Sequence, residues 1–148
     1  DLNFLATRVL LPVILQFAKF AAVGAFSTLF AFGILNILIA VTRITSGVGY
    51  SGFIGLAFIC ATTGSYFFNR YWTFSSANSA STGEFGKFLS VGWLGFALNV
   101  GVASFVVNVV SHPAVFTPER WANIGALSAT ALSLVWNFLG YKFFVFKK

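Results

Sequence analysis

The sequence predicts an all-α membrane protein with four transmembrane helices, arranged as two helical hairpins that repeat each other. Of the 148 residues, 58% are hydrophobic and only 8% are charged, whereas a soluble domain carries roughly 25% charged residues. So few charges could not cover a surface in water, which excludes a soluble globular domain. The apolar residues are gathered into four runs, and the two halves of the chain match each other, which together predict the hairpins.

The N-terminal segment, residues 1–16, is predicted to lie on the membrane surface as an interfacial helix. Its apolar stretch covers residues 9–15 and is interrupted by Pro12, so it is shorter than the roughly 20 residues that a spanning helix needs. We therefore divide the chain into this segment and a transmembrane domain over residues 17–148.

Four apolar runs follow, and each has about the 20 residues that an α-helix needs to cross a hydrocarbon core of about 30 Å. None of the runs contains Asp, Glu, Lys, Arg or His. The predicted transmembrane helices cover residues 20–41, about 50–69, 88–110 and about 121–141. The connections between them, residues 42–49, 75–83 and 111–120, are short and carry polar residues, and the last also contains two prolines.

The distribution of basic residues predicts the orientation in the membrane. With four spans both termini lie on one side, and that side carries seven basic residues: Arg8, Lys19, Arg70, Lys87, Lys142, Lys147 and Lys148. The opposite side carries two, Arg43 and Arg120. Positive residues in short loops stay in the cytoplasm, so both termini are predicted to be cytoplasmic.

The two halves of the chain form an internal repeat, residues 17–74 and 85–146. FAKFAAVG at residues 17–24 matches FGKFLSVG at 85–92, with an offset of 68 residues. SYFFNRYWTF at residues 65–74 matches NFLGYKFFVF at 137–146, with an offset of 72 residues. Because each repeat holds two helices, both repeats should have the same orientation, as a parallel repeat about an axis along the membrane normal.

Basic residues at the helix ends are the candidate binding site for a lipid phosphate. Each repeat supplies two of them, and all four should lie at nearly one membrane depth: Lys19, Arg70, Lys87 and Lys142. Cations at headgroup level beside aromatic rings suit a phosphate attached to a lipid. The alternative is that they are ordinary topology signals that flank the spans.

A second candidate set would contact the headgroup or a sugar, and consists of Asn137, Asn99, Trp72 and Tyr141. An amide inside an apolar span needs a polar partner, because hydrocarbon offers none. A sugar would provide such partners. The alternative for the amides is hydrogen bonding between helices.

The scarcity of reactive residues argues against several classes of protein. One cysteine, one histidine and three acidic residues are too few for a metal site or a paired-carboxylate hydrolase. No glycine-rich phosphate loop is present, and the basic residues are scattered rather than gathered into a nucleic-acid-binding face. We therefore expect no enzyme activity, no cofactor and no nucleic-acid partner. A small multidrug-exporter-like transporter is a second alternative, although a transporter of that kind would normally carry a carboxylate within a span and no span has one.

The repeated motifs resemble those of the GtrA-like family of small four-helix membrane proteins, over about residues 16–148. The similar elements are the lysine motifs that open the first and third spans and the segments 69–74 and 137–146 that close the second and fourth. Ser27 and Ser65 depart from the asparagines common at these positions in the family.

This resemblance implies translocation, by a flippase, of a polyprenyl-phosphate-linked monosaccharide for cell-surface polysaccharide or cell-wall glycosylation. The membrane would be the plasma (inner) membrane of a bacterium or archaeon. The alternative implied by the resemblance is a membrane scaffold that recruits a polyprenyl-phosphate glycosyltransferase. Since four helices are few for a complete pathway, we also expect a homo-oligomer.

Overall fold

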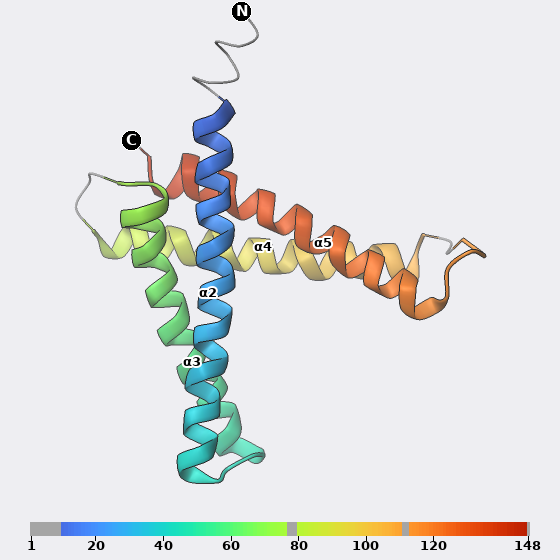
Figure 1. Ribbon diagram of the computed structural model, residues 1–148, viewed down its shortest axis with the longest axis horizontal. Coiled ribbons are helices and arrows are strands. Elements are labelled where there is room, and N and C mark those ends of the chain that lie inside the picture. Colours follow the sequence, from blue (N-terminus) through green and yellow to red (C-terminus); the bar gives the residue numbers. More distant parts are fainter. Residues whose placement is uncertain (1–9, 77–79, 111–112, 148) are drawn as a thin grey trace, which may run out of the picture. The chain divides into compact units, whose positions relative to one another are not determined.

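The computed structural model describes residues 10–76, 80–110 and 113–147, and every regular element in these ranges is helical. Four helices there are long and apolar enough to cross a membrane, which confirms the predicted all-α fold. In chain order they are α2 (Leu11–Thr42), α3 (Gly47–Phe68), α4 (Thr82–Asn108) and α5 (Pro118–Gly140) (Figure 1). Helix α3 continues into a π-helical turn, η2 (Asn69–Thr73), and α5 into another, η3 (Tyr141–Val145).

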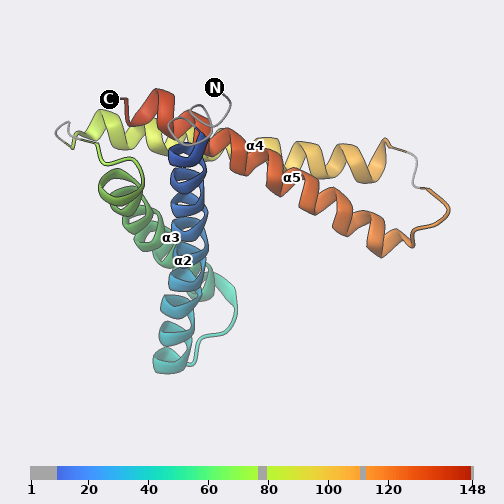
Figure 2. The same ribbon diagram turned by 45° about the horizontal axis from the view of Figure 1, so that its top comes forward.

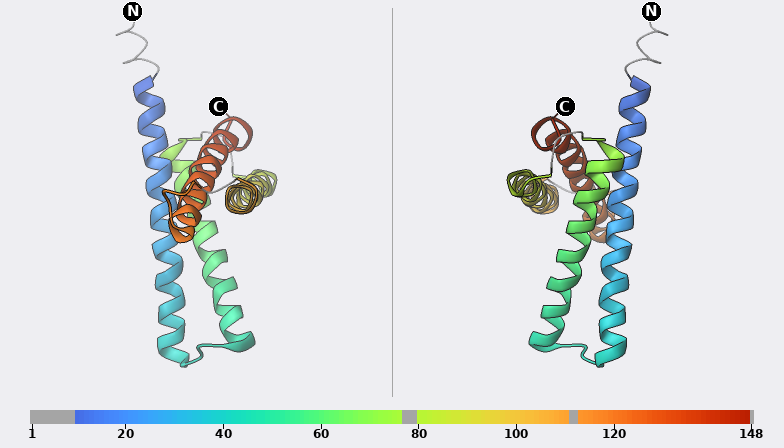
Figure 3. Two further views of the ribbon diagram at one scale, coloured as in Figure 1. Left: turned by 90° about the vertical axis from the view of Figure 1, so that its right-hand side faces the viewer. Right: turned by 90° about the vertical axis from the view of Figure 1, so that its left-hand side faces the viewer.

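The chain forms two compact units, which divide between Ala77 and Asn78. The first unit is a hairpin in which α2 packs against α3, and the second is a hairpin in which α4 packs against α5 (Figure 2). The short connection between α2 and α3 lies at the far end of the first hairpin from η2 (Figure 3). The two units thus hold the two repeats read from the sequence, while the relative orientation of the repeats remains a prediction.

Helix α2 begins earlier than the first apolar run. It is continuous from Leu11 to Thr42, and Pro12 lies in its first turn, where the missing N–H of proline costs no hydrogen bond. Residues 11–16 therefore belong to the first spanning helix without a break, whereas residues 1–9 lie outside the described part of the chain. The separate interfacial segment over 1–16 stays a prediction, and the structure marks no boundary at residue 16.

Capping residues account for the starts of the helices in the second hairpin. The Ser81 side chain accepts a hydrogen bond from the Glu84 backbone N–H at 3.1 Å, and the Thr117 side chain accepts one from the Arg120 backbone N–H at 3.4 Å. Each bond satisfies an N–H that would otherwise lack a partner at the helix start.

The core of each hairpin is narrow, because most large apolar side chains point outward, as suits a helix in lipid. The buried residues recur at repeat-matched positions: Phe20 and Phe88, Val23 and Val91, Ala57 and Ala129, Tyr66 and Phe138, and Phe74 and Phe146. The internal repeat therefore extends to the packing between the helices.

Candidate functional site

Each hairpin ends in a π-helical turn at the same place in the repeat. Asn69–Thr73 and Tyr141–Val145 are separated by the same 72 residues that relate the two closing motifs. Each turn is closed by an equivalent 2.8 Å bond, in which the N–H of Phe74 donates to Asn69 O and the N–H of Phe146 to Tyr141 O. Such turns are rare and occur often at functional sites.

A pair of buried phenylalanines anchors each π turn to the first helix of its hairpin. The Phe20 and Phe74 ring centroids lie 6.4 Å apart at an interplanar angle of 52°, and those of Phe88 and Phe146 lie 6.2 Å apart at 51°. Tyr141 adds a stacked contact with Phe88 at 4.4 Å. The same ring geometry thus fixes the end of the second helix against the first in both hairpins.

A lysine of the first helix lies over an aromatic ring of the π turn in each hairpin. The Lys19 Nζ is 5.5 Å from the centroid of the Trp72 ring, and the Lys87 Nζ is 5.5 Å from that of the Phe144 ring. Both lysines are exposed, and a cation within about 6 Å of a ring face is attracted by its quadrupole. We call this end of each hairpin its basic end.

The basic residues of the π turns share a position but differ in burial. Arg70 is 1% exposed, and its guanidinium lies 5.5 Å from the Tyr71 ring. Lys142 is half-buried, with its Nζ 5.6 Å from the Phe138 ring and 5.7 Å from the Phe143 ring. The structure thus brings Lys19 and Arg70 to one end of the first hairpin, and Lys87 and Lys142 to one end of the second.

The basic end of the first hairpin has a polar interior that the sequence analysis missed. Asn69, Thr73 and Ser76 are buried there. The Asn69 Nδ2 donates to Ser65 O at 2.9 Å and to Ser65 Oγ at 3.2 Å, and the Gln16 Nε2 donates to Thr73 O at 3.2 Å. The repeat alignment contained a signal for this difference, because the second hairpin has Tyr141 and Val145 at the positions of Asn69 and Thr73.

The two asparagines proposed to contact a sugar both lie between α4 and α5. The Asn99 Nδ2 donates to Thr130 Oγ1 at 3.5 Å and to Ser133 Oγ at 3.4 Å, which are long hydrogen bonds between helices. Asn137 lies over Gly95, since a Cβ on that glycine would be 2.8 Å from Asn137 Cγ. Within the described residues the buried Asn137 Oδ1 has no hydrogen-bond partner, so it retains a free acceptor.

The two aromatic members of the same set differ in exposure. Trp72 is exposed at the basic end of the first hairpin, where the Lys19 ammonium group lies over its ring. Tyr141 is buried in the second hairpin and stacks on Phe88, which gives it a packing role. In residues 10–76, 80–110 and 113–147, no three His, Cys, Asp or Glu side chains gather as metal ligands would.

A family model described as "GtrA/DPMS, transmembrane domain" matches residues 19–146. Comparisons with curated proteins and with solved structures gave no significant match. The match begins at Lys19 and ends at Phe146, so it includes both basic ends. Members of this family are generally membrane proteins without catalytic activity. With its four spanning helices, the chain therefore belongs to the GtrA-like family of multi-pass membrane proteins, which handle lipid-linked sugars.

Proposed function

We propose that this protein is a flippase that moves a polyprenyl-phosphate-linked monosaccharide across the plasma (inner) membrane of a bacterium or archaeon. Both termini and both basic ends would face the cytoplasm. This orientation places seven of the nine basic residues on the cytoplasmic side, as the positive-inside rule requires. The transported sugar would serve cell-surface polysaccharide synthesis or cell-wall glycosylation.

One observation supports this proposal above all: the same arrangement of side chains occurs at the basic end of both hairpins. In each, a π turn is anchored by a phenylalanine pair, and a lysine of the neighbouring helix lies over its exposed aromatic ring. A topology signal requires only that positive charge be present in the loop. It does not require an ordered ring beneath the ammonium group, which supports binding of an anion.

The roles of the basic residues follow from their burial. The exposed Lys19 and Lys87 and the half-buried Lys142 would contact the lipid phosphate directly through their ammonium groups. Arg70 is buried below the surface of the first hairpin, and its positive charge would attract the phosphate from behind. In this proposal all four basic residues bind lipid phosphate, with Lys19 and Arg70 at the basic end of the first hairpin and Lys87 and Lys142 at that of the second.

The sugar would pass along a polar track of the second hairpin that includes Asn137 and Asn99, which supply polar atoms within the span. The unpartnered Asn137 Oδ1 would accept a hydroxyl hydrogen bond, and the long bonds of Asn99 would exchange at small cost. The isoprenoid tail would remain in the hydrocarbon. Several copies of the chain would complete the pathway, and a membrane glycosyltransferase would supply the substrate.

A transport assay in proteoliposomes tests the phosphate site. The probe is a fluorescent undecaprenyl-phosphate glucose whose outward-facing fraction is bleached by membrane-impermeant dithionite. Lys19→Gln combined with Lys87→Gln keeps most of each side-chain stem but removes both charges. A Lys or Arg near an anionic lipid surface contributes about 1 kcal/mol, so with that contribution from each lysine the loss of both should weaken the apparent affinity for the lipid about 30-fold.

The matched control is Arg120→Gln, which removes a positive charge at the start of α5, away from the basic end. This variant should transport like the wild type. Transport by the double lysine variant at the wild-type rate and affinity would refute the phosphate site. If the wild type moves no lipid, but a glycosyltransferase copurifies with it and leaves the membrane in its absence, the function is that of a scaffold.

A further inference from the structure

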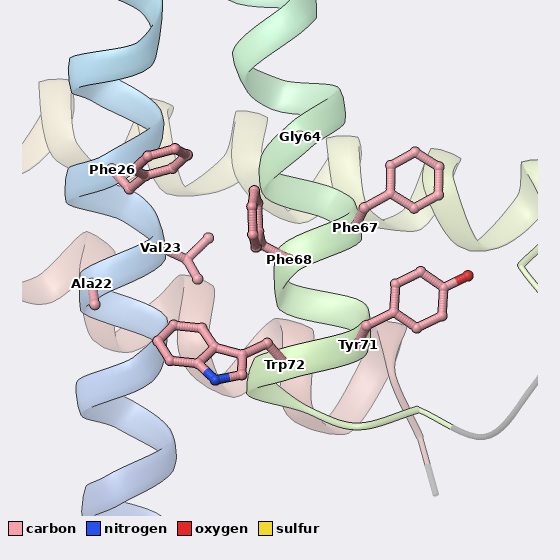
Figure 4. Close-up of a pocket in the computed structure, with 8 residues that line it drawn as sticks. All are labelled: Ala22, Val23, Phe26, Gly64, Phe67, Phe68, Tyr71 and Trp72. Atoms are coloured by element: carbon pink, nitrogen blue, oxygen red, sulfur yellow. The ribbon is translucent and has the colours of Figure 1, made fainter.

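The first hairpin carries an apolar cleft of about 750 Å³. This volume falls within the range of roughly 300–1,000 Å³ that is typical of small-molecule sites. Aromatic side chains of α2, α3 and η2 line it (Figure 4). The lining residues are Ala22, Val23 and Phe26 of α2, Gly64, Phe67 and Phe68 of α3, and Tyr71 and Trp72 of η2.

The two repeats differ at this place, because Gly64 corresponds to Trp136 in the second hairpin. The Trp136 Nε1 donates to Val91 O at 3.3 Å, and Val91 is the counterpart of Val23, which lines the cleft. The Trp136 indole therefore occupies the region that is open in the first hairpin. At Gly64 an added Cβ would meet nothing within 4 Å.

The cleft reaches a positive charge at the basic end. Trp72 forms part of its wall, and the Lys19 ammonium lies 5.5 Å from the centroid of the same ring. An apolar cavity that leads to an exposed cation is complementary to an amphiphile with an anionic head and a hydrocarbon chain.

We propose that this cleft binds the first isoprene units of the translocated lipid, with the lipid phosphate at Lys19. The inference rests on the proposed function and adds that the hairpins are unequal: the first holds the isoprenoid chain, whereas Trp136 closes the second. Because lipid tails are as apolar as the cleft, there is no hydrophobic driving force for a chain to enter it. Binding of the isoprenoid therefore depends on how well its shape fits the cleft and on the contact of its phosphate with Lys19. A methyl-branched isoprenoid fills a wide aromatic cleft better than a narrow, straight acyl chain.

Photocrosslinking tests which molecule occupies the cleft. Benzoylphenylalanine in place of Phe67 reports on the cleft, and the same residue in place of Leu139, its repeat counterpart, is the control. Both native side chains are 45% exposed. In vesicles of phosphatidylglycerol and phosphatidylethanolamine with added undecaprenyl phosphate, position 67 should give the undecaprenyl phosphate adduct and position 139 should give phospholipid adducts. Phospholipid adducts alone at position 67, or adducts to a second copy of the chain, would overturn the inference.

Filling the cleft provides the second measurement. Gly64→Trp places a tryptophan where the second hairpin has Trp136. It should raise the dissociation constant for undecaprenyl phosphate in vesicles about tenfold, equivalent to about 1.4 kcal/mol. Gly55→Trp is the control. It lies on the same helix, has nothing within 4 Å of an added Cβ, and faces the opposite side at 3.6 residues per turn. This variant should bind like the wild type.

The outcomes separate this inference from the proposed function. If Gly64→Trp binds undecaprenyl phosphate normally while the double lysine variant does not, the cleft inference fails and the phosphate site stands. If both variants and the wild type fail to bind it in vesicles, the proposed function fails as well. Weaker binding by Gly64→Trp, with normal binding by Gly55→Trp, supports both.

Discussion

Gly140 permits the close packing of α5 against α4 in the second hairpin. A Cβ at this position would lie 2.6 Å from Val91 Cγ1 and 3.2 Å from Val91 Cγ2, whereas non-bonded carbon atoms normally approach to about 3.5–4.0 Å. Gly140→Ala therefore forces α5, or the Val91 side chain, to move by roughly 1 Å. Valine is branched at Cβ and has few rotamers that would relieve the overlap.

The magnitude follows from two opposing contributions. Overpacking of a close contact costs about 1–3 kcal/mol, and replacing glycine by alanine within a helix returns up to about 1 kcal/mol. Gly101→Ala in α4 of the same hairpin should show only the gain from replacing glycine by alanine, because a Cβ there meets nothing within 4 Å. The difference between the two variants therefore isolates the steric cost, and we expect Gly140→Ala to be less stable by about 1–3 kcal/mol.

The assay is reversible unfolding in mixed micelles, with the free energy of unfolding obtained from a denaturing-detergent titration followed by circular dichroism. Val91→Ala removes the opposing methyl groups, so it should restore most of the loss when combined with Gly140→Ala. Equal stabilities of Gly140→Ala and Gly101→Ala, or simple additivity in the double variant, would refute the packing argument.

Three further predictions use the same unfolding measurement. Gly95→Ser places a side chain against Asn137 and should lower the free energy of unfolding by about 1–3 kcal/mol. Adding Asn137→Ser should recover most of that loss, since the first hairpin has serine at both matched positions. A double variant as unstable as Gly95→Ser alone would contradict this packing argument. Trp136→Phe removes the 3.3 Å bond to Val91 O and should cost about 0.6–1.7 kcal/mol, so an unchanged free energy would show that the bond contributes nothing. Phe88→Leu loses the 4.4 Å stack on the π turn, which is worth about 0.5–1.5 kcal/mol beyond its buried area, and a stability equal to the wild type would exclude that role.

Much of the fold could be predicted because lipid leaves the backbone few choices. An apolar run of about 20 residues must satisfy its own hydrogen bonds in hydrocarbon, so it forms a helix. The start of the first helix was less predictable. The apolar run begins after Lys19, yet α2 starts at Leu11, since one lysine near a helix end does not interrupt the helix and can extend to the interface.

The candidate site was predictable in its residue types but not in its geometry. The repeat identified Lys19, Arg70, Lys87 and Lys142 as matched positions, because charge stands out where so few residues carry it. The burial of Arg70 has no such signal. It depends on how Asn69–Thr73 winds as a π turn and packs against α2.

The sequence alone thus determined the four spans, the duplication and the basic ends, because hydrophobicity, charge and spacing are properties of each local segment. Only the tertiary structure decided which cations are exposed and that the first hairpin keeps an open aromatic cleft where Trp136 closes the second. Contacts such as that of Phe20 with Phe74 join residues far apart in the chain. Their geometry is set by close packing between two helices, where the presence or absence of one side chain opens or fills a cavity.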